Sequence, residues 1–241
     1  MTWKETTMTA EEPVIRTEGL SRTYRQGALE VHALREVSFC CARGELVALA
    51  GPSGSGKSTL LNQLGTLDRP SAGRVLVAGR EVSGLGRSEA ARFRLAHVGF
   101  VFQDYNLLPV LTAYENAEYT LALQGVPFAR RREVVVPLLE RVGLGAMMNR
   151  RPHELSGGQQ QRVAVVRAIA ARPTFVIADE PTANLDSDAS ASLLALFDEL
   201  NRSDGITFLL ASHDAQVIGR ARRMVRLRDG RIEADNGREM S

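Results

Sequence analysis

Residues 51–58 form a glycine-rich segment with the pattern G-x-x-x-x-G-K-S, which is typical of loops that bind phosphate groups. The apolar run Leu46–Ala50 before it predicts a buried strand, and residues 59–64 after it predict the first turns of a helix. Glycines let backbone N–H groups converge on an anion, and the start of a helix adds free N–H groups and the positive end of its dipole. The segment therefore predicts a nucleoside triphosphate site; the alternative is a glycine-rich turn that binds no ligand.

The residue types within this segment indicate separate tasks. Lys57 supplies a positive charge for the β- and γ-phosphates, and the hydroxyl group of Ser58 is placed to ligate Mg²⁺. The other loop residues predicted to contact the nucleotide are Gly51, Ser53, Gly54, Ser55 and Gly56. The loop indicates that a triphosphate binds, but it does not indicate what the triphosphate is used for.

A pair of carboxylates follows a second apolar run. Residues 175–178 predict a strand that ends on Asp179 and Glu180. Proteins with a phosphate-binding loop use a carboxylate at such a strand end to hold Mg²⁺, and a second carboxylate beside it can polarise an attacking water. We therefore predict Asp179 as a metal ligand and Glu180 as a catalytic residue. Without the glycine-rich loop, two adjacent carboxylates would be an ordinary surface feature.

A third pattern, Leu155-Ser156-Gly157-Gly158-Gln159, also has the chemistry of an anion site. Its hydroxyl group and glycine amides stand where a helix is predicted to begin, so they can face a negative charge. Two phosphate-type sites far apart in the sequence can face one ligand or two different ligands. The residues alone leave this question open.

The elements that must position these residues alternate along the chain. Strands are expected at 14–24, 31–42, 46–50, 74–79, 98–103, 174–178, 206–211, 224–227 and 231–232, and helices at 59–64, 88–96, 112–123, 128–142, 156–171, 187–202 and 214–222. This order favours an α/β fold with a mainly parallel sheet core, and the first two strands favour an antiparallel β edge sheet. We expect one domain over 14–235 with a helical subdomain at about 88–172, and tails at 1–13 and 236–241.

Three positions predict how particular helices begin or break. Ser88 is a possible cap of the helix 88–96. Thr112 is the expected cap of the next helix, and Glu115 completes a capping box with it. Pro137 predicts a kink, or two separate helices, within 128–142 because proline lacks the N–H that a helix interior uses.

Composition narrows the class of protein. The chain has 241 residues with 30 basic and 28 acidic side chains, and this balance implies no strong polyanion partner. No apolar run approaches the ~18 residues of a membrane helix, and the polar segment 1–13 does not predict a secretory signal. The only cysteines, Cys40 and Cys41, are adjacent, and we interpret them as buried thiols in a reducing compartment.

Together, the loop 51–58, the pattern 155–159 and the strand end 179–180 resemble the nucleotide-binding subunit of an ATP-binding cassette (ABC) transporter. The resemblance covers about residues 14–230, with the motifs in the family's order and spacing. It implies the fold of a P-loop NTPase of the ABC cassette type. Further segments resemble the subgroup that serves lipoprotein release, macrolide-type efflux and cell-division permeases, namely 31–34, 106–109 and 111–116.

Four weaker motifs match the same family. Tyr24 lies where the family stacks an aromatic ring on adenine, and Gln103 matches the glutamine that reaches Mg²⁺ and water. His213 matches the histidine that contacts the γ-phosphate. Asp186 matches the aspartate of a loop that crosses to the partner subunit. Without the resemblance, Tyr24, Gln103 and His213 would be ordinary residues.

The resemblance answers the question of the two anion sites. It implies that two copies pack head to tail, with each ATP enclosed by residues 51–58 of one copy and 155–159 of the other. Thr59 is then expected to hold phosphate and metal with Lys57 and Ser58. The implied sets are Glu180, His213, Gln103 and Lys57 for catalysis, Ser58, Gln103 and Asp179 for Mg²⁺, and Ser156, Gly157, Gly158, Gln159 and Asp186 across the interface.

The implied function is that of an ATPase subunit, with ATP and Mg²⁺ as cofactors, which energises a separate membrane permease. We expect it at the cytoplasmic face of the inner (plasma) membrane, serving export, lipoprotein release or mechanical transmission of an undefined substrate. One alternative is a soluble ABC-type ATPase acting on DNA or ribosomes, but the chain lacks the usual insertions, and no nucleic-acid partner is expected. Another is a subunit that binds without turnover, against which the intact Glu180 and His213 argue.

Overall fold

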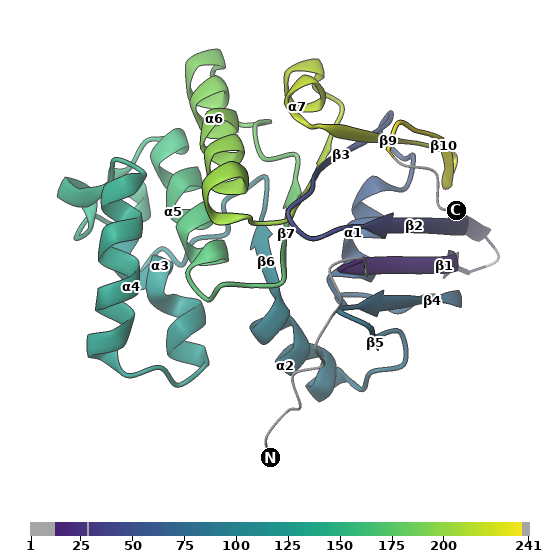
Figure 1. The fold of residues 1–241 in the computed structure, drawn as a ribbon, viewed down its shortest axis with the longest axis horizontal. Helices are drawn as coiled ribbons and strands as arrows, with labels where there is room; N and C mark the ends of the chain where they lie inside the picture. Colours follow the sequence, from purple (N-terminus) through teal and green to yellow (C-terminus); the bar gives the residue numbers. More distant parts are fainter. Residues whose placement is uncertain (1–12, 28, 238–241) are drawn as a thin grey trace.

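The computed structural model describes residues 13–27 and 29–237 (Figure 1). Most of the predicted tail 1–13, and residues 238–241 of the predicted second tail, lie outside the described residues. The strands are β1 (Ile15–Gln26), β2 (Leu29–Cys41), β3 (Leu46–Ala50), β4 (Ala72–Val77), β5 (Arg80–Glu81), β6 (Val98–Val101), β7 (Phe175–Asp179), β8 (Phe208–Ser212), β9 (Arg223–Arg228) and β10 (Arg231–Asp235). The α-helices are α1 (Lys57–Leu64), α2 (Arg87–His97), α3 (Ala113–Leu123), α4 (Phe128–Arg141), α5 (Gly157–Ile169), α6 (Ser187–Asp204) and α7 (Ala215–Arg220). Two short 3₁₀ helices, Gly145–Met147 and Pro152–Glu154, lead into α5.

Six strands form the main sheet, in the order β10-β9-β3-β8-β7-β6. Each pair is parallel except β9 and β10, which form an antiparallel hairpin. β3 and β8 are buried along their whole length, as expected for strands that are covered on both faces. Because parallel strands end at the same edge of a sheet, the segments that follow β3, β7 and β8 meet there, and ligands of open α/β sheets bind at this edge.

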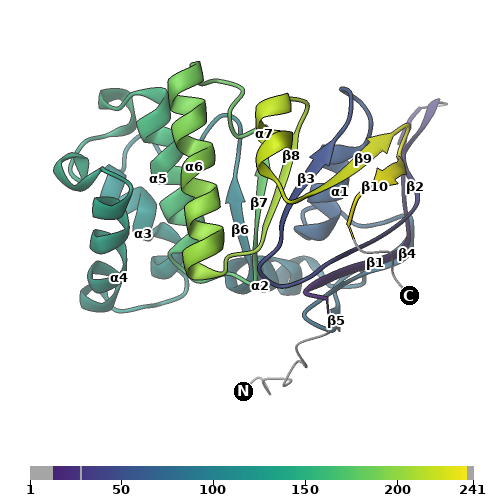
Figure 2. The same ribbon diagram turned by 45° about the horizontal axis from the view of Figure 1, so that its top comes forward.

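A second, antiparallel sheet has the order β2-β1-β4-β5 and lies beside the main sheet (Figures 1 and 2). One hydrophobic core joins the two sheets and α1: Leu20 and Phe39 of the second sheet pack in the same cluster as Leu49 of β3 and Leu60 of α1. The predicted antiparallel edge sheet is confirmed. Its fourth strand, β5, was not expected, because two residues are too short to leave a pattern of alternation.

Helices α3, α4, α5 and α6 gather on the far side of the main sheet from the second sheet (Figure 1). A second hydrophobic core joins them to the sheet, with Ala117 of α3, Leu139 of α4, Val166 of α5, Phe197 of α6 and Phe208 of β8 in one cluster. Strand β6 lies within the segment assigned to the helical subdomain and pairs with β7 at the edge of the main sheet. Within residues 13–27 and 29–237, no helix combines the length and apolar character needed to cross a bilayer.

Of the two helix caps predicted from the sequence, one is confirmed and the other is wrong. Thr112 caps α3 as predicted: its Oγ1 accepts a hydrogen bond from the N–H of Glu115 (3.2 Å), whose carboxylate accepts one from the N–H of Thr112 (2.7 Å). The cap predicted at Ser88 is wrong, because α2 begins one residue earlier. Its cap is Gly86, whose N–H donates to the carboxylate of Glu89 (3.2 Å). The carboxylate of Glu89 thus satisfies an N–H group at the start of α2, so the helix does not need the hydroxyl group of Ser88 as a cap.

Pro137 lies inside a single helix, so the predicted alternative of two helices is wrong. The missing N–H of proline costs α4 one hydrogen bond. On either side of it, Val135 and Leu139 are fully buried in the core that α4 shares with α3 and α5. This burial holds the helix together across the proline, since packing of an apolar face supplies most helix stability in proteins.

Candidate functional site

The glycine-rich loop 51–58 connects the end of β3 to the start of α1, as predicted. Gly56 precedes the helix with a φ of 105°, and a Cβ at this position would lie 2.6 Å from the carbonyl oxygen of Ala33. Lys57 begins the helix, and its Nζ donates hydrogen bonds to the carbonyl oxygens of Gly51 (2.8 Å) and Pro52 (3.1 Å). These carbonyls hold the ammonium group within the loop, where phosphate oxygens can replace them as its partners.

A cavity of about 890 Å³ opens over this loop. The predicted site residues that line it are Tyr24, Ser53, Gly54, Gly56, Lys57, Ser58, Thr59, Gln103, Glu180 and His213. Gly51, Ser55 and Asp179 belong to the same loop and strand end without lining the cavity. The fold thus brings together residues that the sequence predicted from separate motifs, around a cavity with the volume of a typical small-molecule site.

Glu180 is held from two sides by the end of β8. Its Oε2 accepts a hydrogen bond from Oγ of Ser212 (2.9 Å), and its Oε1 lies 2.9 Å from Nδ1 of His213. Its backbone has a φ of 46°, an uncommon left-handed conformation, which its N–H secures by donating to the carbonyl oxygen of Ala211 (2.9 Å). The sequence did not single out Ser212, which is buried; its only signal is its place just before His213.

Asp179 ends β7 and carries the predicted metal-binding carboxylate. Burial raises the pKa of Asp179; the hydroxyl group of Ser58 opposes this shift, the charge of Glu180 adds to it, and the charge of Lys57 opposes it. Its Oδ1 is buried and has no hydrogen-bond partner among the described residues. An unpartnered carboxylate oxygen close to a serine hydroxyl suits Mg²⁺, which takes oxygen ligands.

Phosphate and water would have to complete the shell of such an ion. Among residues 13–27 and 29–237, no group of three or more His, Cys, Asp or Glu side chains is arranged to hold a metal. Mg²⁺ is commonly bound through one or two carboxylates together with substrate phosphates. Ser58 and Asp179 therefore fit Mg²⁺ that arrives with a nucleotide better than a metal bound by the protein alone.

The nucleotide-free protein is expected to gain stability when Asp179 is replaced by Asn. The pKa of Asp179 in the folded chain is raised above the ~3.9 of an unfolded chain, so its ionisation at neutral pH costs folding free energy. We expect Asp179→Asn to raise the free energy of unfolding by about 1 kcal/mol at neutral pH. The gain should shrink as the pH falls through the raised pKa and should vanish below ~3.9, where the carboxyl group becomes protonated in both states. Urea unfolding of both proteins over this pH range measures the effect, and a loss of stability at neutral pH would contradict it.

Tyr24, the predicted adenine-stacking residue, is fixed by two partners that the sequence did not indicate. Its hydroxyl group donates to Oδ2 of Asp68 (2.8 Å), which also pairs with Nε of Arg22 (2.8 Å). The guanidinium group of Arg22 lies 4.4 Å from the centre of the Tyr24 ring and packs over one of its faces. Tyr24 remains 37% exposed, so part of its surface is free to contact a base.

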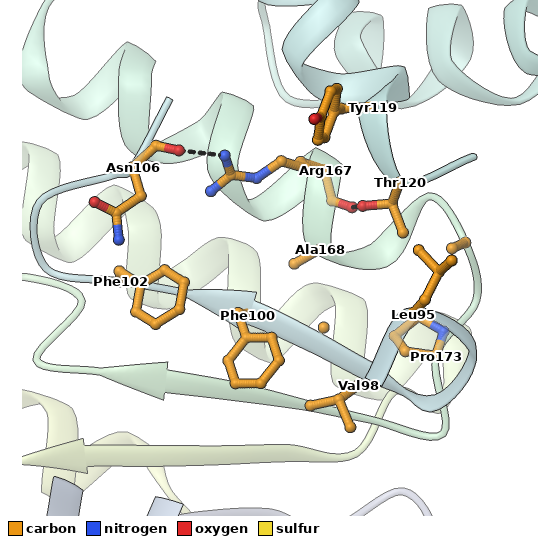
Figure 3. Close-up of a pocket in the computed structure, with 12 residues that line it drawn as sticks. Leu95, Val98, Phe100, Phe102, Asn106, Tyr119, Thr120, Arg167, Ala168 and Pro173 are labelled. Carbon is orange, nitrogen blue, oxygen red and sulfur yellow. Dashed lines mark hydrogen bonds between the residues drawn. The ribbon is translucent and has the colours of Figure 1, made fainter. Parts of the chain in front are cut away.

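The loop after β6 carries Gln103 and is tied to two neighbouring segments. Nδ2 of Asn184 donates to the carbonyl oxygen of Gln103 (3.2 Å). Arg167 of α5 donates to the carbonyl oxygens of Asn106 (2.5 Å) and Tyr105 (2.8 Å), and Figure 3 shows the first of these contacts. Burial lowers the pKa of Arg167. The sequence did not single out Arg167, because its partners are backbone carbonyls about sixty positions away.

A groove lies beside this loop, where β6 meets α3 and α5 (Figure 3). One part of it is a pocket of about 240 Å³, lined by Phe100, Tyr119 and Arg167 among others. The groove continues as an apolar surface that includes Leu67, which is 47% exposed, and Leu123, which is 58% exposed. Large exposed apolar side chains in one groove are typical of a protein–protein contact.

The pattern 155–159 lies outside the cavity. Ser156 caps α5: its Oγ accepts a hydrogen bond from the N–H of Gln159 (3.3 Å), and its own N–H donates to Oε1 of Gln159 (2.9 Å). Asp186 caps α6 by accepting a hydrogen bond from the N–H of Ala189 (2.8 Å). Both caps are exposed, and neither lines the cavity over the glycine-rich loop. One chain alone therefore does not bring the two anion-binding patterns together.

A doubly covered parallel sheet with a phosphate-binding loop and carboxylates at its strand ends defines a P-loop nucleotide-binding protein. The chain also matches the ABC transporter family over residues 34–183. It belongs to that family, and its fold is that of an ABC ATPase cassette. The family and fold predicted from the sequence are confirmed.

Known relatives agree with the predicted subgroup. An uncharacterised ABC transporter ATP-binding protein of Thermotoga maritima is 50% identical over 88% of this chain and 90% of its own length. The lipoprotein-releasing system ATP-binding protein LolD of Anaeromyxobacter dehalogenans is 48% identical over 92% and 94%. The macrolide export ATP-binding/permease protein MacB of Hyphomonas neptunium is 45% identical over 95% of this chain, which spans only 35% of that protein.

Solved structures share the fold over nearly the whole chain. The dimeric post-hydrolysis structure of the ATP-binding cassette MJ0796, bound to ADP and Pi, has a TM-score of 0.85 and 37% sequence identity. The match covers 94% of this chain and all of that one.

Proposed function

We propose that this chain is the ATP-hydrolysing subunit of an ABC transporter, that two copies close head to tail around two ATP molecules, and that this closure drives a separate membrane permease. The observation that carries the proposal is the separation of the two anion-binding patterns: 51–58 borders the cavity, and 155–159 is presented outside it. A second copy supplies the missing pattern. The dimeric structure bound to ADP and Pi, which this chain resembles, supports such a pairing.

Nucleotide binding uses the half of the site that one chain provides. Tyr24, anchored by Asp68 and Arg22, offers ring surface to the adenine. The loop amides and Lys57 bind the β- and γ-phosphates. Ser58 and Asp179 would hold Mg²⁺, with Gln103 close by; when bound, the ion neutralises charge on the phosphate oxygens. Binding therefore requires no second chain.

Hydrolysis requires, beyond nucleotide binding, a positioned water molecule and the second chain. Glu180 accepts the proton of the water whose oxygen attacks the γ-phosphorus; the bond to the β–γ bridging oxygen breaks, and ADP leaves with that oxygen. Ser212 and His213 keep the Glu180 carboxylate in place. The Ser156 hydroxyl and Gly158 amide of the other copy contact the γ-phosphate at the start of α5. Catalysis on this scheme consists of positioning and charge neutralisation, as in phosphoryl transfer generally.

The permease is expected to dock in the groove between β6, α3 and α5. Arg167 lines this groove and donates to the carbonyl oxygen of Tyr105, which belongs to the loop that carries Gln103. Docking and the γ-phosphate site therefore share one loop. Attachment through a permease places the chain at the cytoplasmic face of the inner membrane. The names of the lipoprotein-releasing and macrolide-exporting relatives support export or lipoprotein release as the work performed.

Replacing Leu123 by Glu is expected to abolish attachment to the permease and to leave the basal ATPase activity of the isolated chain unchanged. The side chain is exposed in the groove and does not line the cavity over the glycine-rich loop, so a charge there disrupts an apolar contact without changing the nucleotide site. Purification of the tagged chain from membranes measures the permease that it retains. Phe128→Glu is the matched control, since Phe128 is 55% exposed on α4 and does not line the groove. Equal permease recovery with Leu123→Glu and the unaltered chain would contradict the docking site.

A further inference from the structure

The turn between β9 and β10, formed by Asp229 and Gly230, lies directly against the glycine-rich loop. The N–H of Gly230 donates a hydrogen bond to the carbonyl oxygen of Ser55 (3.0 Å). The carbonyl oxygen of Gly230 accepts one from the N–H of Arg35 in β2 (2.8 Å). A single residue of the last hairpin therefore links the phosphate-binding loop to the sheet that carries Tyr24.

Three backbone segments approach one another closely at this point. A Cβ on Gly230 would lie 2.8 Å from the carbonyl oxygen of Ala33, and a Cβ on Gly56 would lie 2.6 Å from the same oxygen. That Cβ on Gly56 would also lie 3.5 Å from Cα of Gly230. Since backbone packs on backbone here, the place of the turn fixes the place of the loop.

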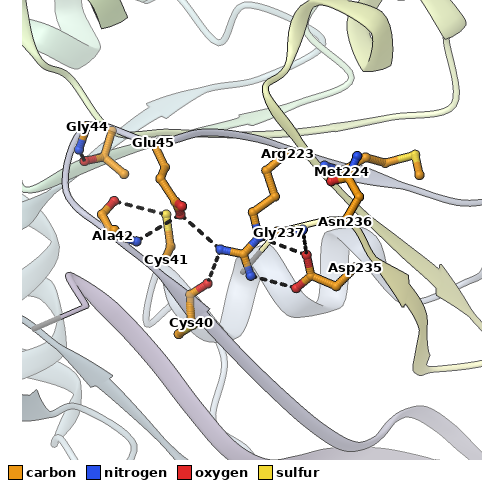
Figure 4. A network of polar contacts seen from close by, with 11 residues as sticks. Cys40, Cys41, Ala42, Gly44, Glu45, Arg223, Met224, Asp235, Asn236 and Gly237 are labelled. Carbon is orange, nitrogen blue, oxygen red and sulfur yellow. Dashed lines mark hydrogen bonds and ion pairs between the residues drawn. The ribbon is translucent and has the colours of Figure 1, made fainter. Parts of the chain in front are cut away.

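The hairpin is anchored at its other end, so the turn has little freedom to drift. Arg223 at the start of β9 forms ion pairs with Asp235 (2.6 Å) and Glu45 (3.0 Å), and it donates to the carbonyl oxygen of Cys40 (2.9 Å), as Figure 4 shows. Between this anchor and the turn, β9 pairs with β3, the strand that leads into the loop.

We propose that the Asp229–Gly230 turn positions the phosphate-binding loop by fixing the peptide between Ser55 and Gly56. In a planar trans peptide, the C=O of one residue and the N–H of the next point in opposite directions. Because Gly230 binds the carbonyl oxygen of Ser55, the N–H of Gly56 faces away from the turn, and Gly56 lines the cavity. The turn thus orients an amide toward the nucleotide; Gly230 is a positioning residue, and this role rests on the proposed nucleotide site.

The chain contains a second turn with the same backbone conformation, and it serves as a control that separates the positioning role of Gly230 from the effect of backbone strain. Ala78 and Gly79, between β4 and β5, have φ values of 49° and 74°, and Asp229 and Gly230 have 48° and 76°. Both pairs are two-residue hairpin turns with positive φ at each position. A Cβ on Gly79, however, would meet nothing within 4 Å. Replacement by alanine therefore brings similar conformational strain to both turns and a clash to only one.

The test compares Gly230→Ala with Gly79→Ala in the full chain. Calorimetry with Mg-ADP measures binding without requiring the dimer, and thermal unfolding measures stability. We expect Gly230→Ala to raise the Kd for Mg-ADP by about tenfold, a size common for coupled sites, and Gly79→Ala to leave it unchanged. In ATPase assays the effect should appear in KM more than in kcat. Equal Kd values for the two variants would overturn the inference, whereas failure of the unaltered chain to bind Mg-ADP would overturn the proposed nucleotide site itself.

Hydrogen exchange in the unaltered chain provides a test that survives if Gly230→Ala does not fold. Coupling between two sites is reciprocal, so a turn that aids nucleotide binding must itself be stabilised by the nucleotide. We expect saturating Mg-ADP to slow amide exchange at Gly230 and to leave the turn at 78–79 unaffected. Unchanged exchange at Gly230, in a sample that binds Mg-ADP, would show that the turn only neighbours the loop.

Discussion

Replacing Glu180 by Gln is expected to reduce ATP turnover by about a thousandfold, the range attributed to a general base, while nucleotide binding persists. The two side chains have the same shape, and the amide oxygen of Gln can still accept the hydrogen bond that Ser212 donates to Glu180. The amide lacks the charge and basicity needed to accept a proton from water. Steady-state phosphate release measures turnover. Size-exclusion chromatography with Mg-ATP should show the variant accumulating as a dimer, since closed dimers that do not hydrolyse ATP do not reopen.

Two further variants separate the role of Glu180 from a general effect of lost charge. Glu81→Gln removes a carboxylate from an exposed position on β5 and should leave turnover unchanged. Ser212→Ala keeps the carboxylate of Glu180 and removes one of the two contacts that hold it, so the loss of turnover should be smaller than with Glu180→Gln. Normal turnover by Glu180→Gln would refute the assignment of the base.

The parts of the site that the sequence predicted are those whose chemistry is local. The glycine-rich loop, the strand before it and the helix after it are consecutive, so that one pattern contains both the ligands and their support. The carboxylates 179–180 likewise follow their own strand. His213 and Gln103 have no such local signal, and only the family resemblance indicated them before the fold placed them at the same cavity.

The residues that the sequence missed act through partners far away in the chain. Asp68 contacts Tyr24 from 44 positions away, and Ser212 contacts Glu180 from 32 positions away. A serine or an aspartate occurs so often on surfaces that its identity does not reveal such a partner. The parallel register of β7 and β8, which places Asp179 opposite Ala211, is what turns Ser212 into a neighbour of the site. This information arises from the fold and not from the local pattern.

The errors in the predicted helices also arise from contacts that the local sequence pattern does not reveal. A serine before a helical pattern is a sound reason to predict a cap at Ser88, but the carboxylate of Glu89 binds the N–H of Gly86 instead and moves the helix start. Pro137 is a sound reason to consider two separate helices, but the burial of Val135 and Leu139 maintains one helix. In both cases a contact with a particular neighbour outweighs an average preference.

Mixing two inactive variants, Lys57→Ala and Ser156→Arg, is expected to restore ATP hydrolysis. Lys57 lies in the loop at the cavity, whereas Ser156 is exposed outside it, so a composite site takes one residue from each chain. In a mixed dimer, one site combines both defects, and the other combines an intact loop with an intact Ser156. Random pairing yields such dimers in about half of the population, and one site in each is intact, so activity should reach about a quarter of that of the unaltered protein.

A site completed within one chain predicts the opposite result, because each chain would then carry its own defect and mixing would repair nothing. The matched control mixes Lys57→Ala with the double variant Lys57→Ala/Ser156→Arg, a pair that forms dimers without any intact site. Light scattering confirms that the chains associate, and phosphate release is compared before and after mixing. Ser156→Arg alone should still bind Mg-ADP, since Ser156 does not line the cavity of its own chain. If the first mixture stays as inactive as this control, the head-to-tail arrangement of the two sites is wrong, even though each chain binds nucleotide.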